Sequence, residues 1–313
     1  MTTVNFTSTQ SWTVPSNCYS LTSCDATGGG VAGYAGGNSS AGHTIGDGGS
    51  GGGAGGRAIA YSIPVTPGEV LTVYVGTAAA AGGAAGNSGL YRSSTHTWLC
   101  LANGGSGING GAGSVGGYKA TGGSGVAGID GNASYNAGLG GNGGASAYGA
   151  NGIGGHTDSY FANGTAGTAA TGYGSGGGGG GGGEYVTGAG YGTGGAGGAG
   201  HAGFTQIVYT PYTAKPPTVT NVSPTSGSPG GGTSVTITGT NFDNEVSAIM
   251  FGTVPAASSV VHSATEILAV SPPHAAGVYD IFVTNKDGTN SSSSSDYFTF
   301  KTSTGFNNPM GGL

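Results

Sequence analysis

The sequence predicts an all-β protein with two parts. The first is an N-terminal β-sandwich with a polyglycine II helix bundle inserted in its loops, and the second is a C-terminal immunoglobulin-like β-sandwich. Three observations predict this. Glycine recurs every third residue through 104–203, short alternating apolar segments flank the glycine blocks, and beyond residue 217 glycine falls while Val, Ile, Thr and Ser rise. The last pattern, short strands separated by turn residues, is typical of an immunoglobulin-like sandwich.

The glycine period is the strongest of these signals. Stepping by three from Gly104 to Gly203 gives 34 positions, of which 24 are glycine, against 14 and five glycines in the other two phases. A period of three indicates an extended helix with three residues per turn and no internal hydrogen bonds. No proline lies between Pro67 and Pro211, which argues against collagen. Because buried unpaired peptide groups are costly, we expect such helices to bond sideways to one another in a bundle.

We assign the scaffold role to glycines on the favoured row. They are Gly104, Gly107, Gly110, Gly113, Gly116, Gly122, Gly125, Gly128, Gly131, Gly194, Gly197, Gly200 and Gly203. Glycine thins out at 132–136, 156–163 and 184–187, which are predicted turns at the ends of the bundle. Polar and aromatic residues there are candidates for contacting a receptor: Tyr135, His156, Asp158, Tyr160, Phe161, Glu184 and Tyr185. Tyr148, Tyr173 and Tyr191 are better interpreted as packing against the scaffold.

The elements of the first domain, residues 1–212, follow from alternation. Strands are expected at 4–7, 11–15, 18–24, 57–63, 69–75, 97–101 and 204–209. Pro67-Gly68 between two of them predicts a β-hairpin of 57–63 with 69–75. The main bundle is expected at 104–203.

A proline-bearing linker at 213–217 leads to a second domain at 218–301, followed by a tail at 302–313. Strands are expected in that domain at 234–238, 248–251, 266–270, 279–284 and 297–300.

Composition narrows the function classes. Only 6% of residues are charged, the net charge is −6, and six Lys and Arg are too few for a phosphate-binding patch, so no nucleic acid partner is expected. No apolar run reaches membrane-spanning length, and no membrane insertion is expected. The N-terminus lacks the pattern of a signal peptide, which predicts synthesis in a cytosol. Cys18, Cys24 and Cys100 are interpreted as buried thiols rather than a disulfide pair plus one.

Motifs with catalytic meaning are weak in this chain. Gly48-Gly-Ser-Gly-Gly52 matches Gly-x-Ser-x-Gly, but it lacks the strand–turn–helix context of a hydrolase. His156 and Asp158 are too few for a metal site. We therefore expect no catalytic residues, no cofactor, no metal and no enzymatic activity.

Two resemblances extend this picture. Residues Val222 to Gly232, Gly239-Thr-Asn-Phe242, Ser271-Pro-Pro273 and Gly277 to Asn285 resemble an IPT/TIG domain, which implies an Ig-like fold with roles from spacer to ligand binding. Trp12-Thr-Val-Pro15, Tyr61 to Gly68, Leu71 to Gly76 and the closing glycine run resemble the glycine-rich domains of bacteriophage tail proteins. The region 104–203, where glycine recurs every third residue, is also similar to the tail-fibre-tip adhesins of T-even-like phages, whose bundle-end loops contact the host.

The resemblance implies a virion protein of the tail tip or tail fibre, made in the host cytoplasm, that binds a host cell-surface glycan or outer-surface protein. Its other expected partners are virion proteins, and a homo-oligomer is left open. The alternatives are a structural or decoration protein of the capsid or tail and, with less support, a bacterial surface adhesin.

Overall fold

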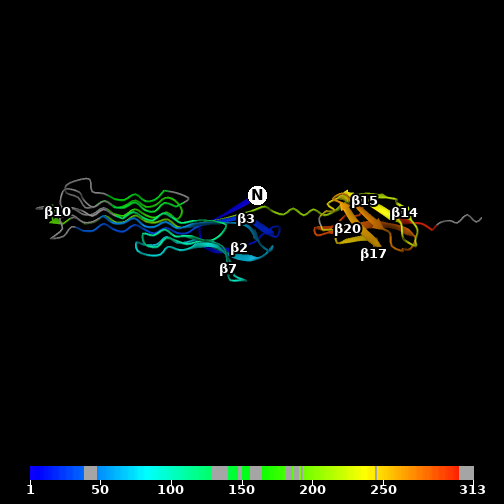
Figure 1. Ribbon diagram of the computed structural model, residues 1–313, viewed down its shortest axis with the longest axis horizontal. Coiled ribbons are helices and arrows are strands. Elements are labelled where there is room, and N and C mark those ends of the chain that lie inside the picture. The colour runs from blue at the N-terminus through cyan, green and yellow to red at the C-terminus, as the bar shows by residue number, and fades with distance from the viewer. Residues whose placement is uncertain are drawn as a thin grey trace, which may run out of the picture. The chain divides into compact units, whose positions relative to one another are not determined.

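The computed structural model of the chain describes residues 1–38, 48–127, 140–146, 150–155, 164–180, 185–186, 190–191, 193–243 and 245–302. The chain divides into two compact units, Met1–Tyr212 and Thr213–Leu313, and each is considered by itself (Figure 1). Within the described residues there are strands and no α-helix, and the chain is all-β.

Unit 1 is built on a sandwich of two five-stranded antiparallel sheets. One has the order β1 (Thr2–Phe6), β12 (Phe204–Tyr209), β3 (Ser20–Thr27), β4 (Arg57–Pro64) and β9 (Tyr118–Ala120). The other has the order β2 (Gln10–Thr13), β5 (Val70–Tyr74), β6 (Ser88–Arg92), β7 (Thr97–Ala102) and β8 (Gly113–Val115). Alternate side chains of both sheets turn inward and form one core, in which Leu21, Leu71, Leu90 and Ile207 are fully buried.

The three cysteines are free thiols in this core. The Sγ of Cys100 lies 3.3 Å from the carbonyl oxygen of Cys24 and 3.4 Å from that of Ala58, and it donates to both. A side-chain hydrogen bond with Cys100, followed by burial, raises the pKa of the Cys24 thiol well above its ordinary value. Thiols held protonated in this way are structural rather than reactive.

The predicted hairpin of 57–63 with 69–75 is wrong. β4 pairs with β3 and β9, whereas β5 pairs with β2 and β6 in the opposite sheet. The turn at Pro67-Gly68, where Gly68 has a φ of 79°, carries the chain from one sheet to the other. Its N–H donates to the Val14 carbonyl at 2.9 Å, so it is fixed against the residue following β2. Alternation alone identifies strands but not their partners, which is why the sequence was misleading here.

The glycine-rich stretches connect the strands of this sandwich. They occupy residues 28–56 between β3 and β4, 76–87 between β5 and β6, 103–112 between β7 and β8, and 121–203 between β9 and β12. Figure 1 shows their described parts as extended traces running side by side from one end of the sandwich. Residues 28–38 and 48–56 lie outside the main bundle expected at 104–203, yet they are bonded into the same stack, while β8 and β9 interrupt it.

Lateral backbone hydrogen bonds in this stack repeat every third residue. The N–H groups of one row in segment 28–38 donate to segment 48–56, from Gly28 to Gly56, Val31 to Gly53 and Tyr34 to Ser50, at 2.8–3.0 Å. Those of another row donate to segment 193–203, from Gly30 to His201, Gly33 to Gly198 and Gly36 to Gly195. A pleated strand would repeat every second residue instead. The glycine-rich segments are therefore not ordinary sheet.

Segment 174–180 lies at the centre of the stack. All seven residues are buried, and backbone hydrogen bonds join them to six segments: 28–38, 48–56, 140–146, 150–155, 164–172 and 193–203. A Cβ built on Gly176, Gly177 or Gly178 would lie 2.0, 1.9 and 2.1 Å from the carbonyl oxygens of Gly52, Gly198 and Ile153 respectively. Three successive residues thus point at three different neighbours. The sequence predicted one row without room for a side chain, whereas all three rows lack it at residues 176–178.

Unit 2 is a second sandwich. One sheet has the order β13 (Thr218–Ser223), β15 (Ser234–Thr240), β19 (Glu266–Val270) and β18 (Ser258–Ser263). The other has the order β14 (Ser226–Gly227), β22 (Tyr297–Phe300), β20 (Gly277–Asn285), β16 (Ala248–Phe251) and β17 (Val254–Pro255), with β21 (Gly288–Thr289) beside β20. The space between them is filled by apolar side chains, and Phe242, Phe251, Phe298, Ile237 and Ile267 are among the largest that are fully buried.

Candidate functional site

The direction of each glycine-rich segment decides where its connections lie. Segment 28–38 leaves the sandwich after β3, and segment 48–56 returns to β4. Segment 121–127 leaves after β9, and the segments that follow alternate in direction until 193–203 enters β12. Four connections therefore begin and end at the end of the stack remote from the sandwich.

Hydrogen bonds hold the described residues at that remote end together. The Gly49 N–H donates to the Gly180 carbonyl at 2.7 Å, and the Gly164 N–H donates to the Thr193 carbonyl at 2.8 Å. The Gly194 N–H reaches the Asn38 Oδ1 at 2.8 Å. A two-stranded ribbon of β10 (Tyr185–Val186) and β11 (Gly190–Tyr191) also lies at this end, where Tyr185 pairs with Tyr191 (Figure 1).

The receptor-contact candidates belong to these remote connections. Tyr185 opens β10, and the other six lie outside the described residues: Tyr135, His156, Asp158, Tyr160, Phe161 and Glu184. The described residues that flank them, 127 and 140, 155 and 164, and 180 and 193, all lie at the remote end. Topology thus brings segments distant in sequence to one end, an arrangement that spacing along the sequence does not reveal.

Most of the scaffold glycines sit against a neighbouring backbone. A Cβ would lie within 2.6 Å of a carbonyl oxygen of another segment at Gly104, Gly110, Gly122, Gly125, Gly194, Gly197, Gly200 and Gly203. Gly107, with a φ of 57°, lies in a turn instead, Gly113 begins β8, and Gly116 lies between β8 and β9. Gly128 and Gly131 are outside the described residues.

Tyr173 lies at the opposite end of the stack, next to the sandwich. Its ring stacks on Phe204 of β12, with centroids 4.9 Å apart and planes at 22°, and meets His201 edge-on at 5.1 Å. The Ser146 hydroxyl donates to its carbonyl oxygen. Tyr173 therefore packs the base of the stack onto the sandwich; Tyr148, in the connection 147–149, lies outside the described residues.

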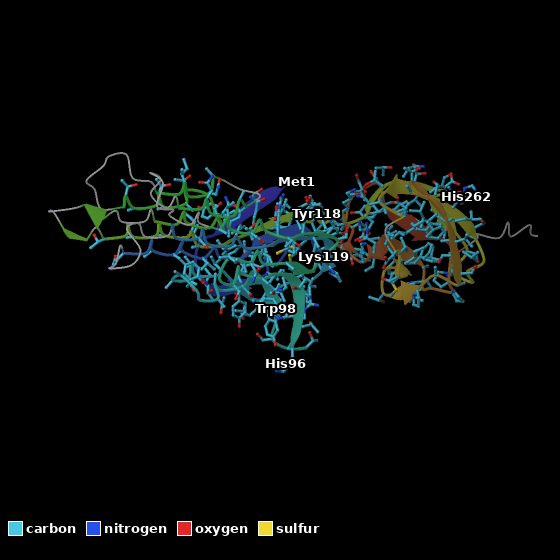
Figure 2. All side chains as sticks on the ribbon, turned by 60° about the vertical axis from the view of Figure 1, so that its left-hand side comes forward. Met1, His96, Trp98, Tyr118, Lys119 and His262 are labelled. Atoms are coloured by element: carbon cyan, nitrogen blue, oxygen red, sulfur yellow. The ribbon has the colours of Figure 1, made fainter. Side chains whose placement is uncertain are left out.

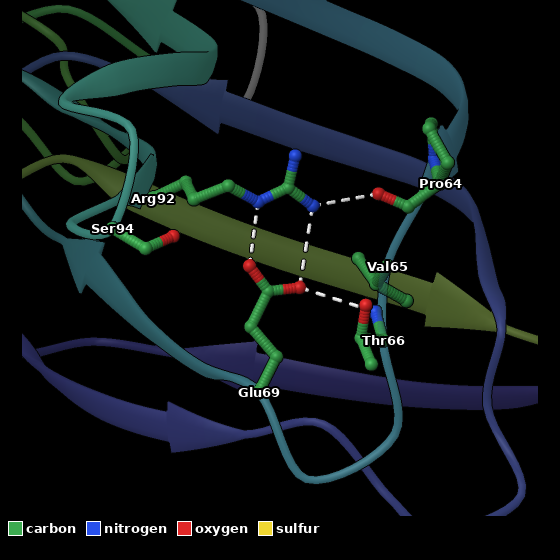
Figure 3. Close-up of a pocket in the computed structure, with 6 residues that line it drawn as sticks. All are labelled: Pro64, Val65, Thr66, Glu69, Arg92 and Ser94. Atoms are coloured by element: carbon green, nitrogen blue, oxygen red, sulfur yellow. Dashed lines mark hydrogen bonds and ion pairs between the residues drawn. The ribbon is translucent and has the colours of Figure 1, made fainter.

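A pocket of about 350 Å³ in unit 1 contains a partly buried ion pair that sequence reasoning missed (Figure 3). The Arg92 Nε lies 2.5 Å from the Glu69 Oε1, and the Arg92 Nη2 donates to the Pro64 carbonyl at 2.7 Å. The Thr66 N–H donates to the Glu69 Oε2 at 3.1 Å. Burial alone would raise the pKa of Glu69, but the hydrogen bonds from Arg92 and Thr66 and the Arg92 charge lower it. These contacts fasten the turn that crosses between the sheets, which is a structural role.

The described residues do not form a catalytic or metal-binding arrangement around the sequence motifs. Ser50, the serine of the Gly-x-Ser-x-Gly match, lies in a glycine-rich extended segment, where its carbonyl accepts the Tyr34 N–H at 2.8 Å. Among the described residues no three His, Cys, Asp or Glu side chains gather into a group that could hold a metal ion. Within the same part of the chain, no helix has the length and apolar character needed to cross a membrane.

Comparison with known families identifies the domain in the second unit. Residues 217–301 match the IPT/TIG domain family, as the sequence predicted from the residues between Val222 and Asn285. This match covers the Ig-like sandwich of β13 to β22. No curated protein matches the chain.

Proposed function

We propose that this chain is a non-enzymatic virion protein of a bacteriophage tail tip or tail fibre. In this proposal the glycine-rich segments form a polyglycine II bundle, and the connections at its remote end recognise a host cell-surface glycan or outer-surface protein. The observation that carries the proposal is the three-residue repeat of lateral hydrogen bonds. It supports a scaffold that brings connections from distant parts of the sequence to one end.

Energetics explain why such a scaffold needs both stacking and an anchor. Ordering a backbone residue costs roughly 1–2 kcal/mol, whereas a net hydrogen bond returns about 0.5–1.5 kcal/mol. An isolated glycine helix would therefore remain unfolded. Segment 174–180 instead bonds to neighbours on all sides, and the paired strands β3/β4, β5/β6 and β7/β8 hold together the ends of the excursions 28–56, 76–87 and 103–112. A loop carried on this support is held in place without being part of the support, which suits recognition.

The chemistry of the connections favours binding over catalysis. Tyrosine combines a flat apolar face with a hydrogen-bonding tip, and three of the contact candidates are tyrosines. Several copies on one particle would convert weak single contacts into firm adsorption. The IPT/TIG unit would then serve as a spacer or as an attachment to other virion proteins.

Adsorption to host cells tests the proposal. Fluorescently labelled full-length protein should bind the bacteria infected by phage that carry it. The double variant Tyr160→Ala/Tyr185→Ala should bind at least about tenfold less, as expected when two aromatic anchors are lost. Tyr61→Ala is the matched control, because Tyr61 is 59% exposed and lies in β4 of the sandwich.

The alternative, a structural or decoration protein, predicts a different outcome. In that case the purified protein would not adsorb to cells, antibody against it would not block infection, and labelled protein would be seen along the capsid or tail. Such a result would reject receptor binding while leaving the polyglycine scaffold intact.

A further inference from the structure

Three aromatic side chains gather on the outer face of the sandwich in unit 1. Tyr74, Tyr91 and Trp98 come from the neighbouring strands β5, β6 and β7. The Trp98 ring centroid lies 5.1 Å from that of Tyr74 and 5.1 Å from that of Tyr91, and the two tyrosine rings are 6.1 Å apart. All three side chains are half-buried. Figure 2 shows Trp98 on the part of the sandwich that carries the β6–β7 turn.

Strand alternation sets this face. Leu71 and Val73 of β5 enter the core, so Tyr74 turns outward. Tyr91 and Trp98 are paired directly in the register of β6 with β7, and their side chains therefore share a face. Gly89 lies opposite Tyr74 in the sheet and is itself buried.

The polar groups beside the rings are uncharged. The Thr72 hydroxyl lies 3.4 Å from the Ser93 hydroxyl, and Ser11 pairs with Thr72 in the sheet. The nearest arginine in sequence, Arg92, is directed away from this face and is held by Glu69 and the Pro64 carbonyl. Half-buried aromatic rings beside neutral hydroxyls are suited to a ligand that has an apolar face and many hydroxyl groups but no charge.

We propose that Tyr74, Tyr91 and Trp98 form a second binding site, specific for a neutral hexose residue of a glycan. The electron-rich faces of the rings meet the C–H face of the sugar, as the charge distribution of an aromatic ring favours. The hydroxyl groups of Thr72, Ser93 and Tyr91 exchange hydrogen bonds with those of the sugar. A shallow site of this kind binds weakly on its own and gains strength from the number of copies.

This site is independent of the one at the remote end of the stack. The cluster belongs to the sheet β2-β5-β6-β7-β8, whereas the receptor-contact candidates belong to connections beyond the glycine-rich segments. A protein with both sites would engage a glycan coat along its side as well as at its tip. Substitutions in one site should therefore leave binding at the other site unchanged.

A glycan array carrying neutral and acidic oligosaccharides tests the proposal, with full-length protein as the probe. Neutral hexose glycans should be bound, and Trp98→Ala and Tyr91→Ala should each weaken that binding at least tenfold. Trp98→Phe should retain part of it, because a ring is kept. Tyr61→Ala, an equivalent change on an exposed tyrosine of the opposite sheet, should leave it unchanged.

Nuclear magnetic resonance then shows whether the sugar meets Trp98. The chain has two tryptophans, so the Trp12→Phe variant leaves a single indole N–H signal. Titrating that variant with the best neutral oligosaccharide should shift the signal saturably. No neutral glycan bound, binding of acidic glycans alone, or binding that survives Trp98→Ala would each overturn the proposal. Binding that survives Trp98→Ala but is lost in Tyr185→Ala would belong to the remote end.

Discussion

The glycine-rich stack of unit 1 and the IPT/TIG sandwich of unit 2 hold their folds by opposite means. In the stack, segment 174–180 is fully buried and almost without side chains, and its peptide groups bond to neighbours all round. In the sandwich, the buried interior consists of side chains such as Phe251, Phe298 and Ile237. Each fully buried side chain of this size contributes roughly 1.5–3 kcal/mol. Segment 174–180 has no comparable term.

This difference implies opposite sensitivities. A sandwich core loses stability when atoms are removed, because a cavity remains. The stack should lose stability when atoms are added, because its segments are already as close as backbones allow. Segment 193–203, at the edge of the stack, shows where side chains are tolerated. Two of its three rows of residues are mainly glycine, while Ala196 and Ala199 of the third row are exposed.

The largest effect is expected from Gly177→Val. The added Cβ would lie 1.9 Å from the Gly198 carbonyl oxygen and 2.5 Å from its carbon, and neither backbone can move without breaking further bonds. We expect a loss of ~3 kcal/mol or more, at or above the upper end for overpacked interiors. Hydrogen exchange measured by mass spectrometry should show protection lost across the glycine-rich segments, with unit 2 unchanged.

Ala199→Val is the matched control for that substitution. Ala199 is exposed on the third row of segment 193–203, so its larger side chain meets solvent. Its effect should stay within about 0.5 kcal/mol, as for other surface changes. Equal loss of protection in both variants would contradict the three-row geometry.

Replacing a large buried side chain by a small one should destabilise unit 2 and leave the glycine-rich stack unchanged. Phe251 is fully buried in unit 2 and meets Phe298 at 5.2 Å and Phe300 at 6.1 Å between ring centroids. Phe251→Ala should destabilise unit 2 by about 3–5 kcal/mol. Since both tryptophans lie in unit 1, their fluorescence should be unaffected, and hydrogen exchange should locate the loss within residues 217–301. Val260→Ala, at a side chain 64% exposed, is the control and should have little effect.

Strands with clear alternation and apolar ends were predictable from the sequence. β12, β16, β19 and β22 have the predicted bounds. β6 and β18 were missed because neither shows an apolar face: β6 contains Gly89 and Arg92, and every residue of β18 is exposed. The pairing of a strand was harder to predict from the sequence than its position. β4 and β5 alternate well, but they belong to different sheets because the corner between them is fastened by Val14, Glu69 and Arg92.

The glycine period predicted sideways bonding but not the position of each segment in the stack. The signal for the central segment was present in the run of glycines from Gly176 to Gly183, which fills all three phases at once. A segment with neighbours on every side needs glycine in every row. A peripheral segment has one row that faces solvent, and Ala or Thr can occupy it. The single favoured phase of glycine over 104–203 is an average over central and peripheral segments.

For the candidate sites, the residues in glycine-poor turns could be named from sequence, but their gathering at one end depends on the direction of each segment. The aromatic cluster was missed for a different reason. Tyr74 and Trp98 lie in predicted strands, but Tyr91 lies in the strand that lacks an apolar pattern, and only the sheet order brings the three together.

The smallest expected effect is on the pH dependence of stability, which should have opposite signs in the two units. In unit 1 the pKa of Glu69 is lowered, so its ionised form stabilises the fold at pH values above its ordinary pKa, and this stability is lost as the pH falls through the lowered value. In unit 2 burial, aided by the nearby Asp280 charge, raises the pKa of Asp296. Its contribution is fully present below the ordinary pKa and is lost as the pH rises through the raised value.

Thermal unfolding of full-length protein between pH 3 and 6, compared with Glu69→Gln and Asp296→Asn, measures both terms. The advantage of wild type over Glu69→Gln should shrink on acidification, because Arg92 then faces an uncharged partner in both proteins, a protonated carboxyl group in one and an amide in the other. The advantage over Asp296→Asn should instead shrink as the pH rises, because burial and the nearby Asp280 charge disfavour the ionised carboxylate more than the Asn290 amide and the Ser293 N–H favour it. The same sign for both variants would mean that one of these carboxyl groups does not titrate as its surroundings indicate. Opposite signs would show that the two units respond to pH as independently as their contrasting interiors imply.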